Sequence, residues 1–261
     1  MVPLKNKELI VFDLDGTLTP SKAAMRPDMT RLFVQLLGKK RVAVIGGGSY
    51  AQFKEQFLAS LRCPPAFLKN LFLFPTTANA FYEYRGGWKK IYAFELPVRE
   101  KSAVRVALRE VEKEVRYSRP KKIYGAVLED RGTQMSFSPL GQDVVTVLGG
   151  KGIRLKEQWK KKNNFLRLKM AKLLAKRLPK LEVRVGGLTT IDITRKGIDK
   201  AYGIHQINKT LHVPIKNMLF IGDALYPGGN DSAARRTGVQ CIAVRGPEDT
   251  KKIIKKILKA A

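Results

Sequence analysis

The chain has 261 residues, of which 44% are hydrophobic, so it is long enough and apolar enough to bury a sizeable core. Its 50 lysines and arginines against 22 aspartates and glutamates give a net charge of +28, which makes nucleic acid a partner to consider. The basic residues run along the whole chain without a zinc-finger spacing, an aromatic RNA-binding motif or a helix-turn-helix signature. We therefore expect nucleic acid not to be its main partner.

Cysteine usage and hydropathy indicate the compartment. The two cysteines, Cys63 and Cys241, lie far apart in the sequence, which argues against a disulfide framework. No apolar run approaches the roughly 18 residues that a membrane span needs. The first eight residues lack the apolar segment of a signal peptide. We expect a cytoplasmic protein that does not contact membranes.

Strand and helix patterns alternate over the first part of the chain. Buried strands are expected at residues 8–14, 41–48 and 70–76, and helices at 27–40 and 49–61, the second with Ser49 as its N-cap. Short apolar strands that alternate with helices predict a parallel sheet covered on both faces.

The alternation stops in the middle of the chain. The patterns predict a hairpin over 80–96, helices over 99–115 and 158–178, and strands over 121–129, 133–139, 181–185 and 189–194. We interpret this segment as a separate α+β module. One face of its sheet is polar and includes Asp192, and that face is either solvated or the floor of a lid over a polar substrate.

The first pattern returns near the C-terminus, with a strand ending at Asp223, a further strand from residue 239 and a closing helix from residue 247. The predicted fold class is therefore α/β, a Rossmann-like doubly wound parallel sheet with an inserted α+β domain of roughly a hundred residues. The expected boundaries are 1–94 for the first part of the core, 95–188 for the insertion and 189–261 for the second part of the core.

Chemistry-bearing residues follow three of the predicted core strands. Asp13 and Asp15 end the first, the glycine run 46–48 with Ser49 ends the second, and Asp223 ends a later one, with Asp231 shortly after. The carboxyl ends of parallel strands meet at one edge of a sheet. Carboxylates beside a glycine loop that can hold a phosphate favour Mg²⁺, which would offset their mutual repulsion.

Each motif alone has a simpler interpretation. Asp-x-Asp at a strand end also fits a Ca²⁺ site or a turn, although an EF-hand is excluded because Gly16 comes too early. The glycines 46–48 also fit a plain tight turn, and they do not form a dinucleotide-binding fingerprint. It is the occurrence of all three motifs in this order that favours a phosphate-handling site.

Together the motifs resemble a known family. Asp-x-Asp-Gly-Thr at 13–17, a hydroxyl residue after the second strand, a lysine, and Gly-Asp with Asn-Asp at 222–231 resemble the four motifs of the haloacid dehalogenase superfamily. The insertion resembles the large cap of its Cof-type (IIB) branch. The stretches FDLDGTLTP, IGGGS, SPLG, GIDKAYGI, DALYPGGND and GPEDT are similar to the eukaryotic-type phosphomannomutases, and this resemblance covers nearly the whole chain.

The resemblance implies roles for the motif residues. Asp13 would be the nucleophile that becomes an aspartyl-phosphate, and Asp15 the general acid/base. The phosphoryl group would be bound by Thr17, Gly47, Ser49 and Lys200; Lys196 also qualifies by type, but the Gly-x-Asp-Lys frame favours Lys200. Mg²⁺ would be held by Asp13, the backbone carbonyl of Asp15, Asp223 and, from farther out, Asp231.

The cap departs from the family pattern. Arg131 stands where the first of three phosphate-binding arginines is expected, but Gln142 replaces the second and Gly149 falls near the third. Thr190 and Asp192 match the sugar-contacting hydroxyl and carboxylate. Each bidentate arginine–phosphate contact contributes about 1.5–3 kcal/mol, so two losses impair a mutase more than a phosphatase.

The sequence thus predicts an Mg²⁺-dependent phosphatase that acts on a small phosphorylated sugar or polyol. The alternative is a phosphomannomutase that interconverts mannose 6-phosphate and mannose 1-phosphate. A basic nucleic-acid-binding protein is a distant alternative. The resemblance also leaves open a homodimer formed through the cap.

Overall fold

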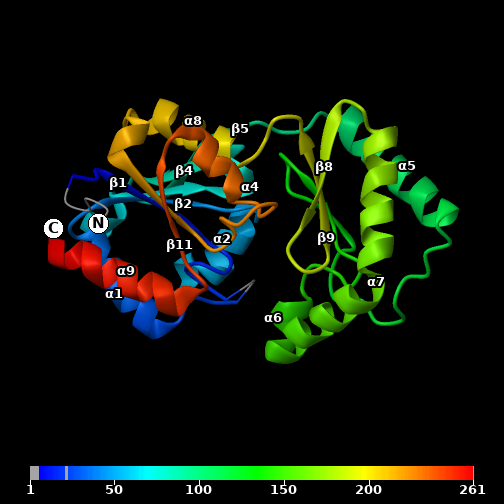
Figure 1. The fold of residues 1–261 in the computed structure, drawn as a ribbon, viewed down its shortest axis with the longest axis horizontal. Coiled ribbons are helices and arrows are strands. Elements are labelled where there is room, and N and C mark those ends of the chain that lie inside the picture. The colour runs from blue at the N-terminus through cyan, green and yellow to red at the C-terminus, as the bar shows by residue number, and fades with distance from the viewer. Residues whose placement is uncertain (1–5, 21–22, 261) are drawn as a thin grey trace. The chain divides into compact units, whose positions relative to one another are not determined.

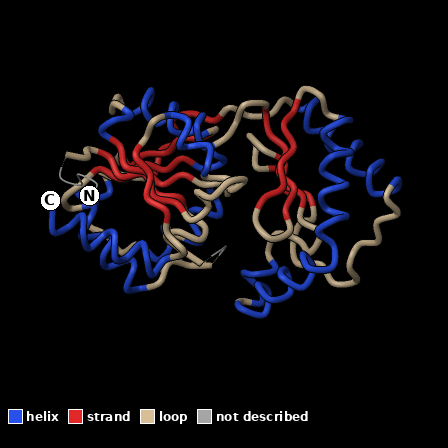
Figure 2. Tube along the Cα trace, viewed as in Figure 1, coloured by secondary structure: helices blue, strands red, loops and turns tan. Residues whose placement is uncertain are grey.

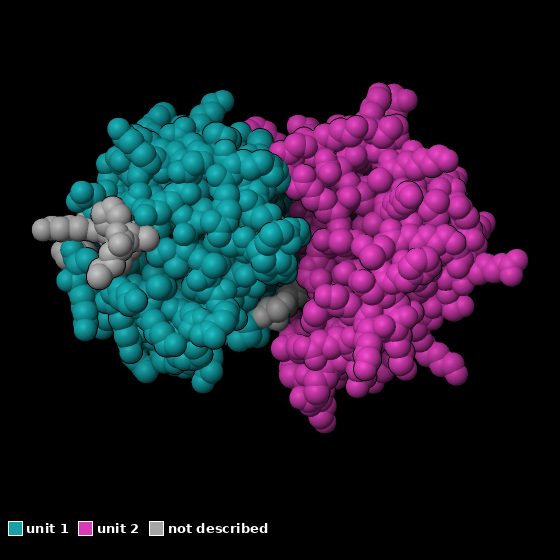
Figure 3. Space-filling view, viewed as in Figure 1, with its two compact units in different colours: residues 1–93, 199–261 teal, residues 94–198 magenta. Residues whose placement is uncertain are grey.

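The structure, a computed structural model, describes residues 6–20 and 23–260. It forms two compact units, residues 1–93 with 199–261 and residues 94–198, which we call the core domain and the cap domain (Figure 3). The first boundary lies one residue from the expected position. The second lies at residue 198 rather than 188, because the strand Thr190–Arg195 pairs with other cap strands and not with the core sheet. The expectation that the N-terminus lacks a signal peptide falls partly on residues 1–5, which lie outside the described residues.

The core domain is built on one seven-stranded sheet, in the order β11-β10-β1-β2-β3-β4-β5. From β11 to β3 the strands run parallel, and the hairpin β4–β5 adds two antiparallel strands. The bounds are Leu9–Asp13 for β1, Arg41–Ile45 for β2, Leu71–Phe74 for β3, Ala80–Tyr84 for β4, Trp88–Ala93 for β5, Met218–Gly222 for β10 and Gln240–Ala243 for β11. The doubly wound parallel sheet expected from the alternating patterns is confirmed.

Helices cover both faces of this sheet (Figures 1 and 2). Successive residues of β1 point to opposite faces: Ile10 and Phe12 pack with α1 and α9, and Leu9 and Val11 pack with α8. The helices are α1 Pro27–Leu37, α2 Tyr50–Gln56, α3 Pro65–Leu68, α4 Pro75–Ala78, α8 Lys200–Leu211 and α9 Pro247–Ala260, with 3₁₀ turns at Leu58–Ser60, Ile215–Asn217 and Ser232–Thr237.

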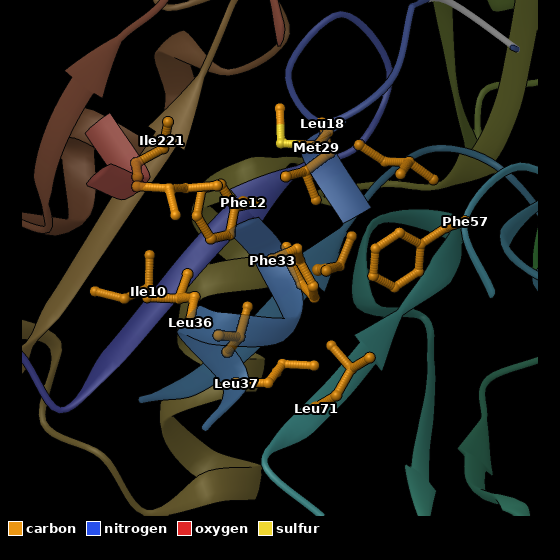
Figure 4. Close-up of a cluster of buried hydrophobic side chains, with 14 of the residues drawn as sticks. Ile10, Phe12, Leu18, Met29, Phe33, Leu36, Leu37, Phe57, Leu71 and Ile221 are labelled. Atoms are coloured by element: carbon orange, nitrogen blue, oxygen red, sulfur yellow. The ribbon is translucent and has the colours of Figure 1, made fainter. Parts of the chain in front are cut away.

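Aromatic packing fixes the carboxyl end of β1. The ring of Phe12 lies 6.0 Å from that of Phe33 on α1, and Phe33 meets Phe57 edge-to-face at 5.1 Å (Figure 4). All three side chains are fully buried. The first pair is tilted and the second is edge-to-face, and an edge-to-face pair adds stabilisation beyond the burial of apolar area. The residue after Phe12, Asp13, is therefore held by a rigid support.

The cap domain is a four-stranded antiparallel sheet, in the order β6-β7-β9-β8, with helices packed on one face (Figure 2). That face buries Met135, Phe137, Ile191 and Ile193 against α5 and α7. The bounds are Val98–Glu114 for α5, Leu128–Asp130 for β6, Met135–Phe137 for β7, Val144–Leu148 for α6, Gly150–Arg177 for α7, Leu181–Gly186 for β8 and Thr190–Arg195 for β9.

Two cap elements differ from the expectation. The strand expected at 121–129 is reduced to β6, because Tyr124 bonds to the loop at Leu140 and Asp143 and not to the sheet. The long basic helix begins at Gly150 rather than Gln158, directly after α6, because Gly149 turns the chain with a φ of +54°. The contacts of Tyr124 have no local sequence signal, whereas the Gly149-Gly150 pair is one for the turn.

Two features of the structure concern membrane spans and disulfides. In the described part of the chain, no helix combines the length and apolar character that crossing a membrane requires. Cys63 and Cys241 carry free thiols.

Helix α8 is bounded by two residues with distinct backbone roles. Asp199 is the N-cap, and its side chain accepts a hydrogen bond from the Tyr202 N–H at 3.0 Å. His212 ends the helix in the left-handed region, with a φ of +53°, and is exposed to solvent. A side chain at such a position is strained, and glycine is the residue that helices usually place there.

Replacing His212 with glycine should therefore stabilise the core domain. We expect His212→Gly to raise the free energy of unfolding by about 0.5–1 kcal/mol, because the left-handed strain of about 1–2 kcal/mol exceeds the entropy cost of glycine. The matched control is His205→Gly, an exposed site inside the same helix, which should lose about 0.3–0.5 kcal/mol, the difference between the helix propensities of histidine and glycine. Denaturant unfolding measures both, and equal destabilisation by the two changes would contradict this account.

Candidate active site

The candidate site lies where three core strands end. β1 ends at Asp13, β2 is followed by the glycines 46–48, and β10 is followed by Asp223. β1 pairs with both other strands, so the three ends are adjacent. The chain winds outward from β1 in both directions, and ligands of open α/β sheets bind at this topological switch point.

A lysine reaches this point from the start of α8. The Nζ of Lys200 contacts the Asp13 carboxylate, lies 3.0 Å from Asp231 Oδ1 and donates to the Ile45 carbonyl at 3.3 Å. The helix can approach because Gly203 packs on Ile45: a Cβ at Gly203 would lie 2.3 Å from the Ile45 Cδ1. Of the two lysines considered, Lys200 is thus the one at the site, whereas Lys196 is an exposed residue of the cap domain.

Three carboxylates gather around this lysine. Oxygens of Asp13, Asp223 and Asp231 lie within 4.8 Å of one another, with Asp13 and Asp231 buried. Gly16 makes room for them: its φ is +88°, and a Cβ there would lie 2.4 Å from Asp223 Oδ2. Thr17 donates from Oγ1 to Asp223 Oδ1 at 3.4 Å. The residues of the Asp-x-Asp-Gly-Thr motif therefore form one wall of the cluster.

The charges of this cluster are unbalanced. Burial raises the pKa of Asp13 well above its ordinary value, the Asp231 and Asp223 carboxylates raise it further, and Lys200 opposes them. Burial and then Asp231 also raise the pKa of Asp223. Burial alone would lower the pKa of Lys200, but the carboxylates of Asp13 and Asp231 outweigh it and raise that pKa, so the ammonium persists. Three carboxylates against one ammonium suit a divalent cation, and an oxygen-only donor set fits Mg²⁺.

Asp15 lies apart from the cluster. It is partly exposed, and its carboxylate is not among the three that meet. The chain turns sharply after it, where the Gly16 N–H donates to the Thr19 carbonyl at 2.7 Å. The resemblance implies that Asp15 binds Mg²⁺ through its backbone carbonyl and not through its carboxylate, and this contact stays a prediction.

The glycine loop is held in place by its neighbours. Ser49 forms a capping box with Gln52, in which the Ser49 Oγ accepts from the Gln52 N–H at 3.3 Å. The Ser49 hydroxyl hydrogen can therefore still be donated to a phosphate oxygen. A Cβ at Gly47 would meet no atom within 4 Å, so the space above the loop is open.

A strained turn supports this loop from β3. Thr76, Thr77 and Ala78 all have positive φ, between 48° and 64°. Their backbone reaches the loop: the Thr76 N–H donates to the Gly48 carbonyl at 2.9 Å, and the Thr77 N–H donates to the Gly46 carbonyl at 2.8 Å. Consecutive left-handed residues other than glycine are costly, and such strain clusters at functional sites.

The predicted cap residues form a hydrogen-bonded chain on the polar face of the cap sheet. Arg131 Nη2 donates to Gln142 Oε1 at 3.3 Å, and Gln142 Nε2 donates to the Ser136 carbonyl at 2.9 Å. Ser136 Oγ in turn donates to Asp192 Oδ1 at 2.6 Å. The Thr190 hydroxyl donates to the Gly186 carbonyl at 2.6 Å.

Sequence reasoning missed two members of this network. Ser136 links Gln142 to Asp192, and Glu129 pairs with Arg131 at 2.8 Å. The polar alternation of Gln134, Ser136 and Ser138 was the available signal for Ser136, but no local signal marks Glu129. Its carboxylate already balances the Arg131 guanidinium.

At Gly149 the backbone conformation itself, and not only the missing side chain, departs from what an arginine needs. Its backbone adopts φ +54° and ψ −131°, a conformation that essentially only glycine adopts. An arginine could not occupy this position without a change in the junction between α6 and α7. The departure at Gln142, by contrast, can be reversed by one substitution.

Comparison with known proteins identifies relatives along the whole chain. Residues 29–260 match the family described as eukaryotic phosphomannomutase. The chain is 26% identical to a probable phosphomannomutase of Caenorhabditis elegans over 98% of both chains. It is 29% identical to a phosphomannomutase of Encephalitozoon cuniculi over 97% of this chain and 94% of that one.

Solved structures share the fold. The N-terminally truncated IMP-nucleotidase of Plasmodium falciparum superposes with a TM-score of 0.68 at 17% identity, over 99% of this chain and 72% of that one. A trehalose-6-phosphate phosphatase of Aspergillus fumigatus superposes with a TM-score of 0.57 at 15% identity, over 98% and 96% of the two chains.

The acidic cluster leads to a test of metal binding. Saturating Mg²⁺ should raise the melting temperature of the native protein, because a ligand at a hundred times its Kd stabilises the folded state by about 2.7 kcal/mol. Asp223→Asn should lose most of that rise, and Asp192→Asn, which lies in the cap, should keep it. Differential scanning calorimetry measures all three, and an undiminished rise in Asp223→Asn would show that the cation binds elsewhere.

Proposed function

We infer the function of this chain from the family to which it belongs, the eukaryotic phosphomannomutases of the haloacid dehalogenase superfamily. The chain is an enzyme of the phosphohydrolase or phosphomutase kind. We propose that it interconverts mannose 6-phosphate and mannose 1-phosphate. The observation that carries this proposal is the match over residues 29–260, which includes the lysine and later aspartates of the cluster. It favours the mutase over the phosphatase that the sequence analysis placed first.

The proposed chemistry is transfer of a phosphoryl group through Asp13. An Asp13 oxygen attacks one phosphorus of a hexose bisphosphate, an O–P bond forms, and the bond from phosphorus to the sugar oxygen breaks while Asp15 gives that oxygen a proton, which leaves a sugar monophosphate. In the second step, the free hydroxyl of a sugar monophosphate attacks the aspartyl-phosphate, the bond from phosphorus to Asp13 breaks, and Asp15 accepts the hydroxyl proton, so that the bisphosphate forms. Lys200, Ser49 and the N–H groups of the glycine loop bind the phosphoryl oxygens.

We assign a Mg²⁺ site to the same cluster. Asp13, Asp223 and the backbone carbonyl of Asp15 would hold the ion, with Asp231 behind them. When bound, it supplies positive charge that reduces repulsion between the nucleophile and the phosphate dianion. The unbalanced charge of the three carboxylates supports this assignment.

A phosphatase is the second candidate, because of the cap. A mutase must retain a bisphosphorylated sugar while that intermediate reorients. Here Gln142 takes a position where the resemblance expects an arginine, and Arg131 is already paired with Glu129. Fewer arginine guanidinium groups are left to bind a distal phosphate, which favours release of the bisphosphorylated sugar and hydrolysis of the aspartyl-phosphate.

The nucleophile is tested by Asp13→Asn. This change should abolish turnover of mannose 1-phosphate and leave the melting temperature within a few degrees, because asparagine keeps the volume and Lys200 keeps its contact with Asp231. Asp249→Asn, which changes an ion pair with Arg245 at the start of α9, serves as a control that should retain measurable turnover. Native-like activity of Asp13→Asn would rule out covalent catalysis at this position.

The two candidate functions differ in their products. With mannose 1-phosphate and a hexose bisphosphate primer, the native protein should form mannose 6-phosphate faster than free phosphate. Chromatographic quantification of both products checks this. Free phosphate as the main product would replace the mutase by the phosphatase.

Gln142→Arg tests the departure in the cap. The planar guanidinium of an arginine beside Arg131 should tighten binding of the bisphosphate about tenfold, the equivalent of about 1.4 kcal/mol. It should also lower the share of free phosphate among the products. Gln142→Lys adds the same charge without the planar guanidinium and should gain less. Binding unaltered by both variants would show that Gln142 does not face the bound sugar.

A further inference from the structure

Arg167 on α7 is a buried cation in the cap domain. Its side chain is 5% exposed. Nη1 donates to the Gly186 and Gly187 carbonyls at 3.4 and 3.3 Å, and Nη2 donates to Asn164 Oδ1 at 2.9 Å. All three acceptors are uncharged. Five N–H donors are present, so this set leaves part of the guanidinium unused.

No carboxylate balances this guanidinium. Within residues 6–20 and 23–260, no acidic oxygen lies within 4.0 Å of Arg167, and its buried Nε has no hydrogen-bond partner. Burial lowers the pKa of Arg167, which shows the cost of the isolated charge. Elsewhere in the cap, Arg131 pairs with Glu129, and Arg177 pairs with Glu110 and Glu114. A buried cation is normally paired, so an anion is the missing partner of Arg167.

A hollow in the surface adjoins this group. It has a volume of about 440 Å³ and is lined by Glu157, Lys160, Lys161, Asn164 and Leu188. Asn164 lines the hollow and accepts from Arg167, and Leu188 follows the Gly187 whose carbonyl Arg167 also contacts. Neither lining lysine has a carboxylate within 4.0 Å among the described residues. Glu157 is the single acid in the lining, so the hollow and its buried wall are net positive.

The turn that accepts hydrogen bonds from Arg167 also borders the polar face of the cap sheet. The Gly186 carbonyl accepts from Thr190 as well as from Arg167. A Cβ on Gly186 would lie 2.5 Å from Asp192 Oδ2. An anion held at Arg167 would therefore lie next to the turn that positions both predicted sugar contacts.

We propose that the hollow formed by Lys160, Lys161 and Asn164 beside Arg167 is a binding site for a phosphoryl group. Two sources offer this chemistry: the distal phosphate of a bisphosphorylated sugar, or inorganic phosphate as a separate ligand. The first source rests on the proposed function, and the second does not. If Arg167 only supports the turn between β8 and β9, phosphate does not bind there.

Phosphate titration of the full-length protein, followed by amide NMR, tests the site. Inorganic phosphate should shift the Gly187 and Leu188 amide signals saturably. Combined replacement of the half-buried Lys160 and the exposed Lys161, Lys160→Gln with Lys161→Gln, should weaken this titration at least tenfold. The matched control, Lys169→Gln with Lys172→Gln, removes the same charge from the same helix outside the hollow and should change it less than twofold.

Two results would overturn the proposal. One is the absence of a saturable shift at Gly187 and Leu188 in the native protein. The other is equal weakening by the control pair, which would reduce the effect to the general positive charge of the chain. Arg167→Gln should abolish the shift, and the lysine pair keeps the test decisive should that variant not fold.

Kinetics of the Lys160 and Lys161 double variant distinguish the two sources. If the ligand is a distal phosphate, the bisphosphate concentration for half-maximal mutase rate should rise about tenfold, while hydrolysis of acetyl phosphate changes less than twofold. If the ligand is inorganic phosphate, the bisphosphate dependence should stay as in the native protein while the amide shift is lost. A native protein without any turnover would contradict the proposed function, and the amide titration would still decide the site.

Discussion

The contact of Lys200 with the carboxylates of Asp13 and Asp231 is the interaction on which the arrangement of the core depends. It joins the end of β1, the start of α8 and the loop after β10, three segments that are distant in sequence. Because Lys200 follows directly on the cap segment, the same contact fixes where the chain re-enters the core. Buried ion clusters are expensive compared with apolar packing, so this one is best explained by chemistry and not by stability.

Apolar runs and motif order were sufficient to predict the core. β1, β2 and β10 are fully or nearly fully buried strands, and parallel strands buried on both faces leave a continuous apolar signal. Asp13 is the last residue of β1, and the glycine loop and Asp223 directly follow β2 and β10, so the meeting of these three could be anticipated. The N-cap role of Ser49 was predictable for the same reason, since it depends only on neighbours within three residues.

The remaining features depend on contacts that no local pattern encodes. The left-handed turn at Thr76 and Thr77 contradicts the preference of β-branched residues, and hydrogen bonds to the glycine loop hold it. Ser136 meets Asp192 only because β7 and β9 pair in that register. The cap boundary was misplaced because β9 follows β8 through a turn of three residues and looks, in sequence, like a return to the core.

The balance between mutase and phosphatase rests on the cap, whereas the chemistry common to both rests on Asp13. Family membership describes ancestry over the whole chain, but Gln142, the Arg131–Glu129 pair and the backbone of Gly149 are properties of this chain itself. Retention of a bisphosphorylated intermediate depends on how much positive charge the cap offers a distal phosphate. We propose the guanidinium of Arg167, which no carboxylate among the described residues balances, as a source of such charge outside the positions that the resemblance indicates.

The central claim is that Asp13 carries the phosphoryl group. An aspartyl-phosphate is reduced by borohydride to homoserine, which leaves a permanent mark on the residue that was phosphorylated. The protein should be mixed with mannose 1-phosphate and Mg²⁺, trapped with borohydride during turnover and mapped by peptide mass spectrometry. The account predicts homoserine at position 13, and turnover without that mark, or with homoserine at another aspartate, would contradict it.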